Sequence, residues 1–170
     1  LRLDQVDPTP MESRIIAATA EREPVSWWIT DLRPGDDSWI RPEFDDATWR
    51  TAPGGFGSAG TPGAVVRTDW RTQDLWLRRQ FEVPADFTAV KGRSLALRIH
   101  HDEDTEIYLN GVEVARAGRW TTGYTELPLS PEAVAALRCK RDAEDNIRPV
   151  AKIRSRVWRE LKGVGRIAPV

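Results

Sequence analysis

The sequence holds a single cysteine, Cys139, so the chain can form neither an internal disulfide nor a cysteine-based metal site by itself. It lacks an apolar run long enough for a signal peptide or a membrane span, and we expect no membrane span. It also lacks a phosphate-cradling glycine loop, and no serine stands in a nucleophile-elbow setting beside a histidine. These absences favour a binding module over an enzyme.

The 170 residues are enough for one domain with appendages, and the net charge of −1 hides an uneven distribution. Acidic residues outnumber basic ones up to residue 137, whereas basic residues dominate residues 138–170. We expect an irregular lead-in over residues 1–13, a β-sandwich over 14–138 and a basic tail over 139–170. Because the chain begins with Leu1, we expect it to be a piece of a longer or processed protein.

Alternation of apolar and polar residues over 74–118 is typical of short β-strands with one face in a core. In the first of these strands one set of residues is predicted to face inward: Leu75, Leu77, Phe81 and Val83. The other set is predicted to face outward: Trp76, Arg78, Gln80 and Glu82. Arg79 shares the inward parity, so its guanidinium must reach a sheet edge, a carboxylate or solvent.

Asn110-Gly111 supplies the two positive-φ positions of a type I′ turn and predicts a hairpin between residues 107–109 and 112–115. Further strands are expected over 14–18 and 24–30. Ser130-Pro131-Glu132 has the signals of a helix start and predicts a short helical turn over 131–138. The fold class is therefore all-β, an antiparallel β-sandwich with one short helical turn.

The basic tail follows a different pattern from the rest of the chain. Its apolar residues fall at helical spacing between Arg and Lys, which predicts a basic amphipathic helix over 151–162. A nucleic-acid or membrane-surface role for this tail is disfavoured, because Trp158 is the one aromatic residue among its charges.

Three motifs in order carry a family resemblance: F-D-D-A-T-W-R (44–50), L-W-L-R-R-Q-F-E-V-P (75–84) and E-I-Y-L-N-G-V-E-V-A (106–115). They resemble the sugar-binding domain of glycoside hydrolase family 2 and, more broadly, galactose-binding-like jelly-roll domains. The stretches G-G-F-G-S-A-G-T-P-G-A-V-V-R-T-D-W and I-H-H-D-E-D are similar to a variant beside glutaminase-A-like extracellular hydrolases.

This resemblance implies a non-catalytic jelly-roll module beside a catalytic domain, contacting carbohydrate or packing against that domain, in an extracellular or periplasmic protein. It implies no required cofactor, although a structural calcium ion occurs in such domains. Two alternatives stay open: the loop over 54–69 completes the active-site rim of a parent hydrolase, or the chain is a structural protein-interaction domain. Such domains close with a final apolar strand; either residues 147–153 are a poor substitute for it, or the last strand is missing.

Aromatic residues in polar loops are the candidates for carbohydrate contact, because a sugar site combines an aromatic face with groups that hydrogen-bond hydroxyls. The candidate carbohydrate-binding residues are Arg67, Asp69, Trp70, His101, Trp120 and Tyr124. Packing against a neighbouring domain would use the same residues.

The acidic run Asp102, Glu103 and Asp104 offers the oxygen ligands that calcium takes, although a solvated acidic turn is the commoner outcome of such a run. His100 and His101 are adjacent on a strand and point to opposite faces, so the pair cannot hold one metal. Asp45-Asp46 fits a calcium or sugar contact, but a turn in which the side chains cap backbone amides is the favoured interpretation. We assign no catalytic residue.

Overall fold

The computed structural model describes residues 14–83, 95–137 and 150–156. Its strands are β1 (Ser26–Thr30), β2 (Arg50–Pro53), β3 (Phe56–Gly57), β4 (Thr68–Asp69), β5 (Asp74–Gln80), β6 (Ala96–Ile99), β7 (Thr105–Leu109), β8 (Val112–Ala117), β9 (Thr125–Pro128) and β10 (Val150–Arg156). The helices are a 3-10 turn η1 (Asp37–Ile40) and α1 (Pro131–Ala136). None of the helices in these ranges is long and apolar enough to cross a membrane.

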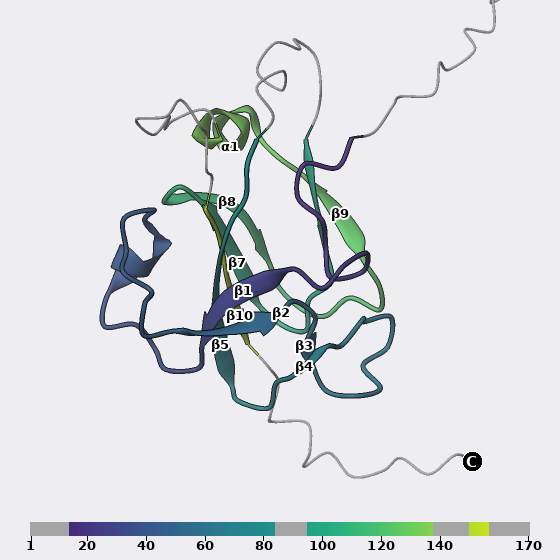
Figure 1. Cartoon of the computed structure of the whole chain (residues 1–170). Helices are drawn as coiled ribbons and strands as arrows, with labels where there is room; N and C mark the ends of the chain where they lie inside the picture. Colours follow the sequence, from purple (N-terminus) through teal and green to yellow (C-terminus); the bar gives the residue numbers. More distant parts are fainter. Residues whose placement is uncertain (1–13, 84–94, 138–149, 157–170) are drawn as a thin grey trace, which may run out of the picture.

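Six strands form the main sheet in the order β2-β1-β5-β10-β7-β8, and every neighbouring pair in it is antiparallel (Figure 1). β6 pairs with β9 in a second antiparallel sheet, and β3 with β4 in a short parallel one. The predicted all-β antiparallel sandwich is therefore confirmed.

The inward face of the main sheet is apolar, as the alternation predicts. Ile29, Leu75 and Leu77 form one buried cluster with Ala52 and Trp70. A second cluster combines residues from the main sheet, the ends of β6 and β9, and α1: Val83, Leu109 and Leu137, with Ile16, Phe81, Leu95, Val114 and Leu129 packed around them. The main sheet and the ends of β6 and β9 thus meet in the second cluster.

Local turn and cap signals in the sequence correctly predicted two elements, the β7–β8 hairpin and the start of α1. Asn110 and Gly111 have φ values of 51° and 85°, and they join β7 to β8 in the predicted hairpin. The Ser130 side chain accepts a hydrogen bond from the Ala133 amide, with Pro131 in the first turn of α1. The strand expected over 14–18 is wrong, because this segment has no sheet partner in the described structure.

β10 corrects the prediction for the tail and extends the sandwich beyond residue 138. Residues 150–156 form a strand between β5 and β7, not a helix, and Ile153 lies in register with Leu77 and Ile107. The sequence of this strand, A-K-I-R-S-R, also alternates between apolar and polar residues. Pairing with the edges of β5 and β7 favours the extended strand over the helix that the spacing predicted. A strand beyond residue 138 therefore belongs to the main sheet; residues 157–162 lie outside the described ranges.

The outward face of β5 is buried as well, which the prediction for Trp76 and Arg78 missed. Both side chains are at most 4% exposed, and Arg78 reaches backbone carbonyls of η1 and the loop that follows it. Arg79 on the inward face donates a hydrogen bond of 2.7 Å to the carbonyl of Ala18 and lies 5.7 Å from the Trp27 ring. Burial lowers the pKa of Arg79.

Candidate functional site

The loop between β8 and β9 presents the most exposed aromatic residue of the described chain. Trp120 is 60% exposed, and Arg119 before it has a φ of 65°, an unusual value for a residue with a side chain. Thr121 and His101 exchange three hydrogen bonds: two from the Thr121 amide and hydroxyl to the His101 carbonyl, and one back from the His101 amide. The backbone next to Trp120 is therefore held by hydrogen bonds to His101.

Tyr124 lies at the other end of the same loop, in a cluster of rings and charges. Its ring is 5.6 Å from the ring of His100 and 5.7 Å from the guanidinium carbon of Arg98. Arg98 is itself held by two hydrogen bonds of 2.7 and 2.9 Å to the carboxylate of Glu21. Burial raises the pKa of Tyr124, so its hydroxyl stays protonated at neutral pH.

The glycine-rich loop over 57–67 docks against this cluster. His100 Nε2 lies 3.0 Å from the carbonyl oxygen of Pro62. Gly63 has a φ of 70°, and a Cβ built on it would lie 2.1 Å from the carbonyl oxygen of Thr122, so only glycine fits. The Arg67 guanidinium donates a hydrogen bond to the carbonyl of Ala20, so this side chain has a structural contact within the fold.

The structure places two of the predicted carbohydrate residues elsewhere. Trp70 is 7% exposed within the apolar core, and its Nε1 donates a hydrogen bond of 2.8 Å to the Thr72 hydroxyl. The expectation that it offers an open ring is wrong. Asp69 is exposed on β4 and pairs with Arg71 at 2.7 Å. His101 is also 7% exposed, with Nδ1 2.9 Å from the carbonyl of Glu103. Of the predicted set, Trp120 alone presents a largely exposed aromatic ring.

The acidic run over 102–104 forms a turn whose middle residue, Glu103, has a φ of 68°. Burial, and then the neighbouring carboxylates of Asp102 and Asp104, raise the pKa of Glu103. Within the described ranges no group of three or more His, Cys, Asp or Glu side chains is arranged to hold a metal ion. Calcium binding here is a prediction that rests on the sequence alone.

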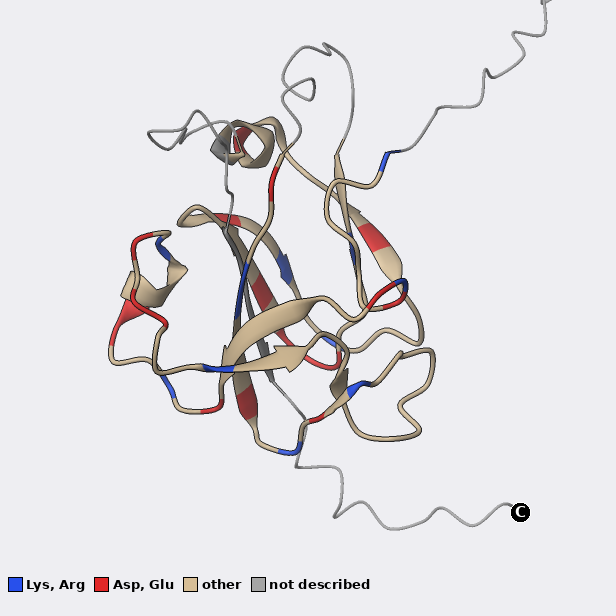
Figure 2. Cartoon of the chain, in the orientation of Figure 1, with Lys and Arg blue, Asp and Glu red and all other residues tan. Residues whose placement is uncertain are grey.

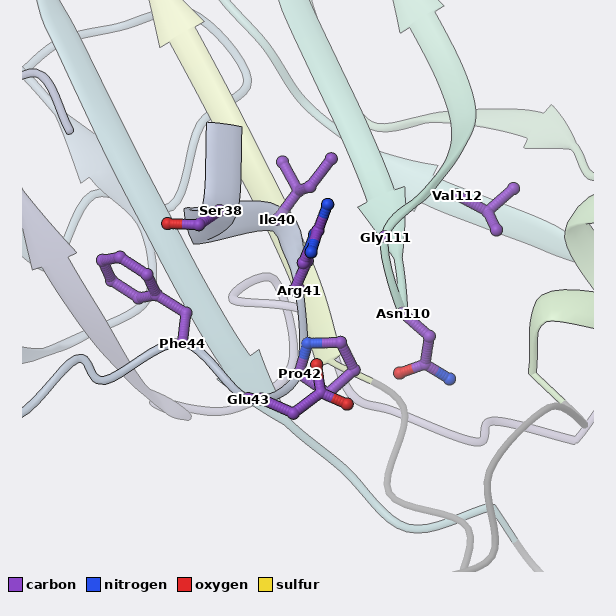
Figure 3. Close-up of a pocket in the computed structure, with 9 residues that line it drawn as sticks. All are labelled: Ser38, Ile40, Arg41, Pro42, Glu43, Phe44, Asn110, Gly111 and Val112. Atoms are coloured by element: carbon purple, nitrogen blue, oxygen red, sulfur yellow. The ribbon is translucent and has the colours of Figure 1, made fainter. Parts of the chain in front are cut away.

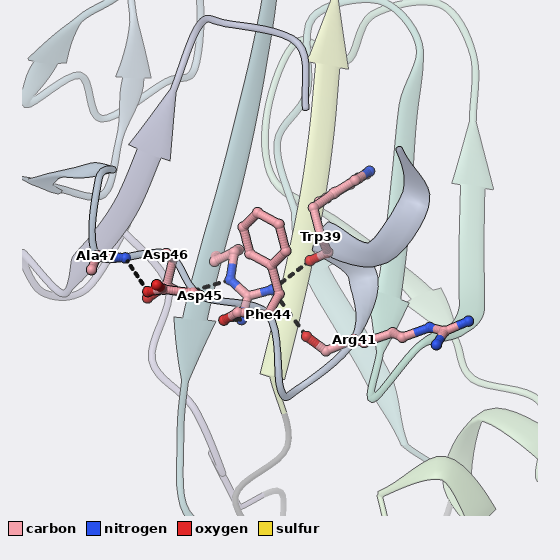
Figure 4. A network of polar contacts seen from close by, with 7 residues as sticks. Trp39, Arg41, Phe44, Asp45, Asp46 and Ala47 are labelled. Carbon is pink, nitrogen blue, oxygen red and sulfur yellow. Dashed lines mark hydrogen bonds and ion pairs between the residues drawn. The ribbon is translucent and has the colours of Figure 1, made fainter. Parts of the chain in front are cut away.

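Arg78 is the centre of a polar network that sequence reasoning did not find (Figure 4). Its Nε forms an ion pair of 2.6 Å with Asp46, and its two terminal nitrogens donate to the carbonyls of Trp39, Arg41 and Phe44. Burial lowers the pKa of Arg78, whereas its hydrogen bond to Asp46 raises it. The Asp46 carboxylate thus holds an arginine, whereas Asp45 caps the Ala47 amide at 3.0 Å as predicted.

A pocket of about 890 Å³ lies between the loop that Arg78 holds and the β7–β8 turn (Figure 3). The loop contributes Ser38, Ile40, Arg41, Pro42, Glu43 and Phe44, and the turn contributes Asn110, Gly111 and Val112. The Asn-Gly signal identified the turn, but no local pattern indicates that a loop 70 positions earlier in the sequence faces it.

Charges of both signs are interspersed over the described structure, as Figure 2 shows along its strands. On the outward face of the main sheet, Arg116 pairs with Glu106 at 2.5 Å and with Glu113 at 2.7 Å. The Tyr108 hydroxyl donates a hydrogen bond of 3.0 Å to Glu106, and burial together with that carboxylate raises the pKa of Tyr108 to about 12.

The described residues form an all-β antiparallel sandwich domain with an exposed aromatic loop and a pocket of mixed polar and apolar lining. Solved structures with low similarity include a Bacteroides uniformis β-glucuronidase (16% identity, TM-score 0.49, 85% of this chain and 15% of that chain). They also include a glycosyl hydrolase family 2 member from Bacteroides cellulosilyticus (19% identity, TM-score 0.47, 77% of this chain and 16% of that chain). A third is a Ruminococcus gnavus β-glucuronidase in complex with D-glucaro 1,5-lactone, with 15% identity and a TM-score of 0.46. That match covers 79% of this chain and 21% of that chain.

The chain thus spans about a fifth or less of the length of these structures. No protein-family model matches the sequence. No curated protein matches it either.

Proposed function

We propose that the chain is a non-catalytic, galactose-binding-like module accessory to a glycoside hydrolase, and that it contacts carbohydrate through the loop around Trp120. The three motifs behind the family resemblance support the first part, because they belong to one unit of the fold. Asp46 of the first motif pairs with Arg78 of the second. Trp39, whose carbonyl accepts from Arg78, packs edge-on against Tyr108 of the third at 5.7 Å.

The observation that carries the second part is the 60% exposed side chain of Trp120, next to Thr121, which hydrogen-bonds His101. An aromatic face binds the apolar C–H face of a pyranose ring, and the indole N–H offers a hydrogen-bond donor at its edge. Its exposed neighbours Arg119 and Thr122 add polar groups for hydroxyls. Three hydrogen bonds between Thr121 and His101 already fix the loop, so binding would cost little ordering of the backbone.

The second candidate function is packing of this same face against a neighbouring catalytic domain, with the loop over 54–69 completing its active-site rim. The observation that favours it is the docking of that glycine-rich loop onto Thr122 and His100, which gives a long loop a fixed position. A fixed loop beside an exposed tryptophan suits a protein interface as well as a sugar site.

The test is a calorimetric titration of the chain with neutral mono- and oligosaccharides, repeated with Trp120→Ala. We expect the variant to bind at least about tenfold more weakly, equivalent to about 1.4 kcal/mol. Leu32→Ala is the matched control, because Leu32 is 76% exposed and lies on another part of the surface. Unchanged affinity in Trp120→Ala would reject the assignment. A chain that binds no saccharide, but loses association with a parent catalytic domain on the same substitution, would favour the packing function.

A further inference from the structure

The open end of the β7–β8 hairpin lies next to Trp120 in the chain. The last pair of the ladder at this end is Thr105 with Ala117. Beyond it, three hydrogen bonds between His101 and Thr121 hold the two chains together again. The three residues 102–104 therefore face the three residues 118–120, and the acidic turn Asp-Glu-Asp lies against the segment Gly-Arg-Trp.

The Asp104 carboxylate lies against the loop that carries Trp120. A Cβ built on Gly118 would be 3.2 Å from Oδ1 of Asp104, so even a methyl group at position 118 would crowd this carboxylate. Asp104 is exposed, and its side chain has no ion-pair or hydrogen-bond partner among the residues that the structure describes. Its oxygens are therefore open to a ligand that contacts the neighbouring tryptophan.

Arg119 supplies the opposite charge from the same loop. Its side chain is exposed, and in the described part of the chain its guanidinium forms no ion pair with the acidic turn. A carboxylate accepts hydrogen bonds and a guanidinium donates them, so Asp104 and Arg119 together match a hydroxyl group, which does both. The 60% exposed side chain of Trp120 adds an aromatic face for the C–H groups of a sugar ring.

The charges beside the indole disfavour an acidic sugar. The carboxylates of Asp102, Glu103 and Asp104 outnumber the single guanidinium of Arg119 on the segment that they face. Their mutual repulsion is evident at Glu103, because burial and then the carboxylates of Asp102 and Asp104 raise its pKa. A uronate would bring a further negative charge into this field, whereas a neutral sugar would not.

We propose that Asp104 is a ligand-contacting residue of the site around Trp120, where its carboxylate accepts hydrogen bonds from a neutral saccharide and disfavours uronates. This inference rests on the proposed function, because it requires that the loop around Trp120 contacts carbohydrate. It adds a side chain from the other strand of the hairpin and a charge class for the ligand. Hydrogen bonds to an ionised carboxylate are stronger than those between neutral groups, so Asp104 would contribute strongly to affinity.

The experiment is an NMR titration of the whole chain with cellobiose, lactose, xylobiose and digalacturonate, each added separately. Asp104→Asn keeps the shape of the side chain but removes its charge and one acceptor, and should weaken binding of the neutral disaccharides about tenfold. The wild type should bind digalacturonate more weakly than the neutral disaccharides, and Asp104→Asn should leave that affinity unchanged or raise it. Asp31→Asn is the matched control, because Asp31 is an exposed carboxylate beside Leu32, and it should change neither affinity.

The outcomes separate this inference from the proposed function. If Trp120→Ala weakens binding of the neutral disaccharides but Asp104→Asn does not, the role of Asp104 is overturned and the proposed function stands. A wild type that prefers digalacturonate would overturn the charge class and leave carbohydrate contact standing. Unchanged affinity in both variants would place the sugar elsewhere and reject both proposals. If the wild type binds none of the four saccharides, carbohydrate contact itself is rejected, and the role of Asp104 with it.

Discussion

Replacing Arg78 should destabilise the fold more than any other single arginine substitution in the described structure. The side chain is 1% exposed and serves four acceptors, namely Asp46 and the carbonyls of Trp39, Arg41 and Phe44. Removing one partner of a buried ion pair costs about 3–5 kcal/mol. Each carbonyl that loses its donor adds about 1 kcal/mol where water cannot replace it.

These costs do not add fully, because the Asp46 side chain is 20% exposed and water can reach part of its carboxylate. We expect Arg78→Ala to lower the free energy of unfolding by about 3–5 kcal/mol. A domain of this size has about 5–15 kcal/mol in total, so the variant will be marginal. Arg78→Lys provides a second measurement: one ammonium group cannot reach all four acceptors, and we expect a loss of about 1–3 kcal/mol.

The assay is urea denaturation followed by tryptophan fluorescence, with the same m-value required for each variant. Arg33→Ala is the control, since exposed substitutions of this kind change stability by about 0.5 kcal/mol or less. If Arg78→Ala and Arg78→Lys both unfold within about 0.5 kcal/mol of the wild type, the network does not hold the loop, and the reasoning is refuted.

Three further predictions concern other parts of the fold. Gly63→Ala should lower the free energy of unfolding by about 1–3 kcal/mol, measured by thermal or urea unfolding, because its Cβ would clash with the Thr122 carbonyl. Gly35→Ala is the control and should be neutral, because a Cβ there would have nothing within 4 Å. Equal effects of the two substitutions would contradict the docked position of the loop. Because the pKa of Tyr108 is raised from 10.0 to about 12, its contribution to stability is complete below pH 10 and is lost as the pH rises through about 12. Tyr108→Phe should flatten that decline in urea unfolding measured against pH, and an unchanged slope would refute it. Chelator treatment should leave the melting temperature unchanged, because the carboxylates of residues 102–104 do not gather into a metal site; a clear fall would restore the calcium prediction.

The elements that could be predicted from the sequence are those with a signal in adjacent residues. Asn110-Gly111 sets its turn by positive φ alone, and Ser130 with Pro131 caps a helix within four residues. β5 shows its inward face by a period of two. Each signal is local, so the rest of the chain does not need to be known.

Features that depend on distant contacts could not be read in this way. β10 exists because β5 and β7 leave a gap between them, and its own residues also fit a helical period. Trp70 stands in a polar stretch and is nevertheless in the core, since the neighbouring β3 and β4 close over that cluster. Residue type identified Trp120 as a candidate, but only the fold separated it from Trp70.

The buried outward face of β5 changes what the first motif means for function. The first motif, F-D-D-A-T-W, resembles a family signature. If Arg78 faced solvent, Asp46 of this motif would be a candidate for ligand binding. Because Arg78 is buried, the carboxylate and three loop carbonyls are occupied in holding residues 39–46 against the sheet. The motif therefore acts as a support that holds this loop against the main sheet.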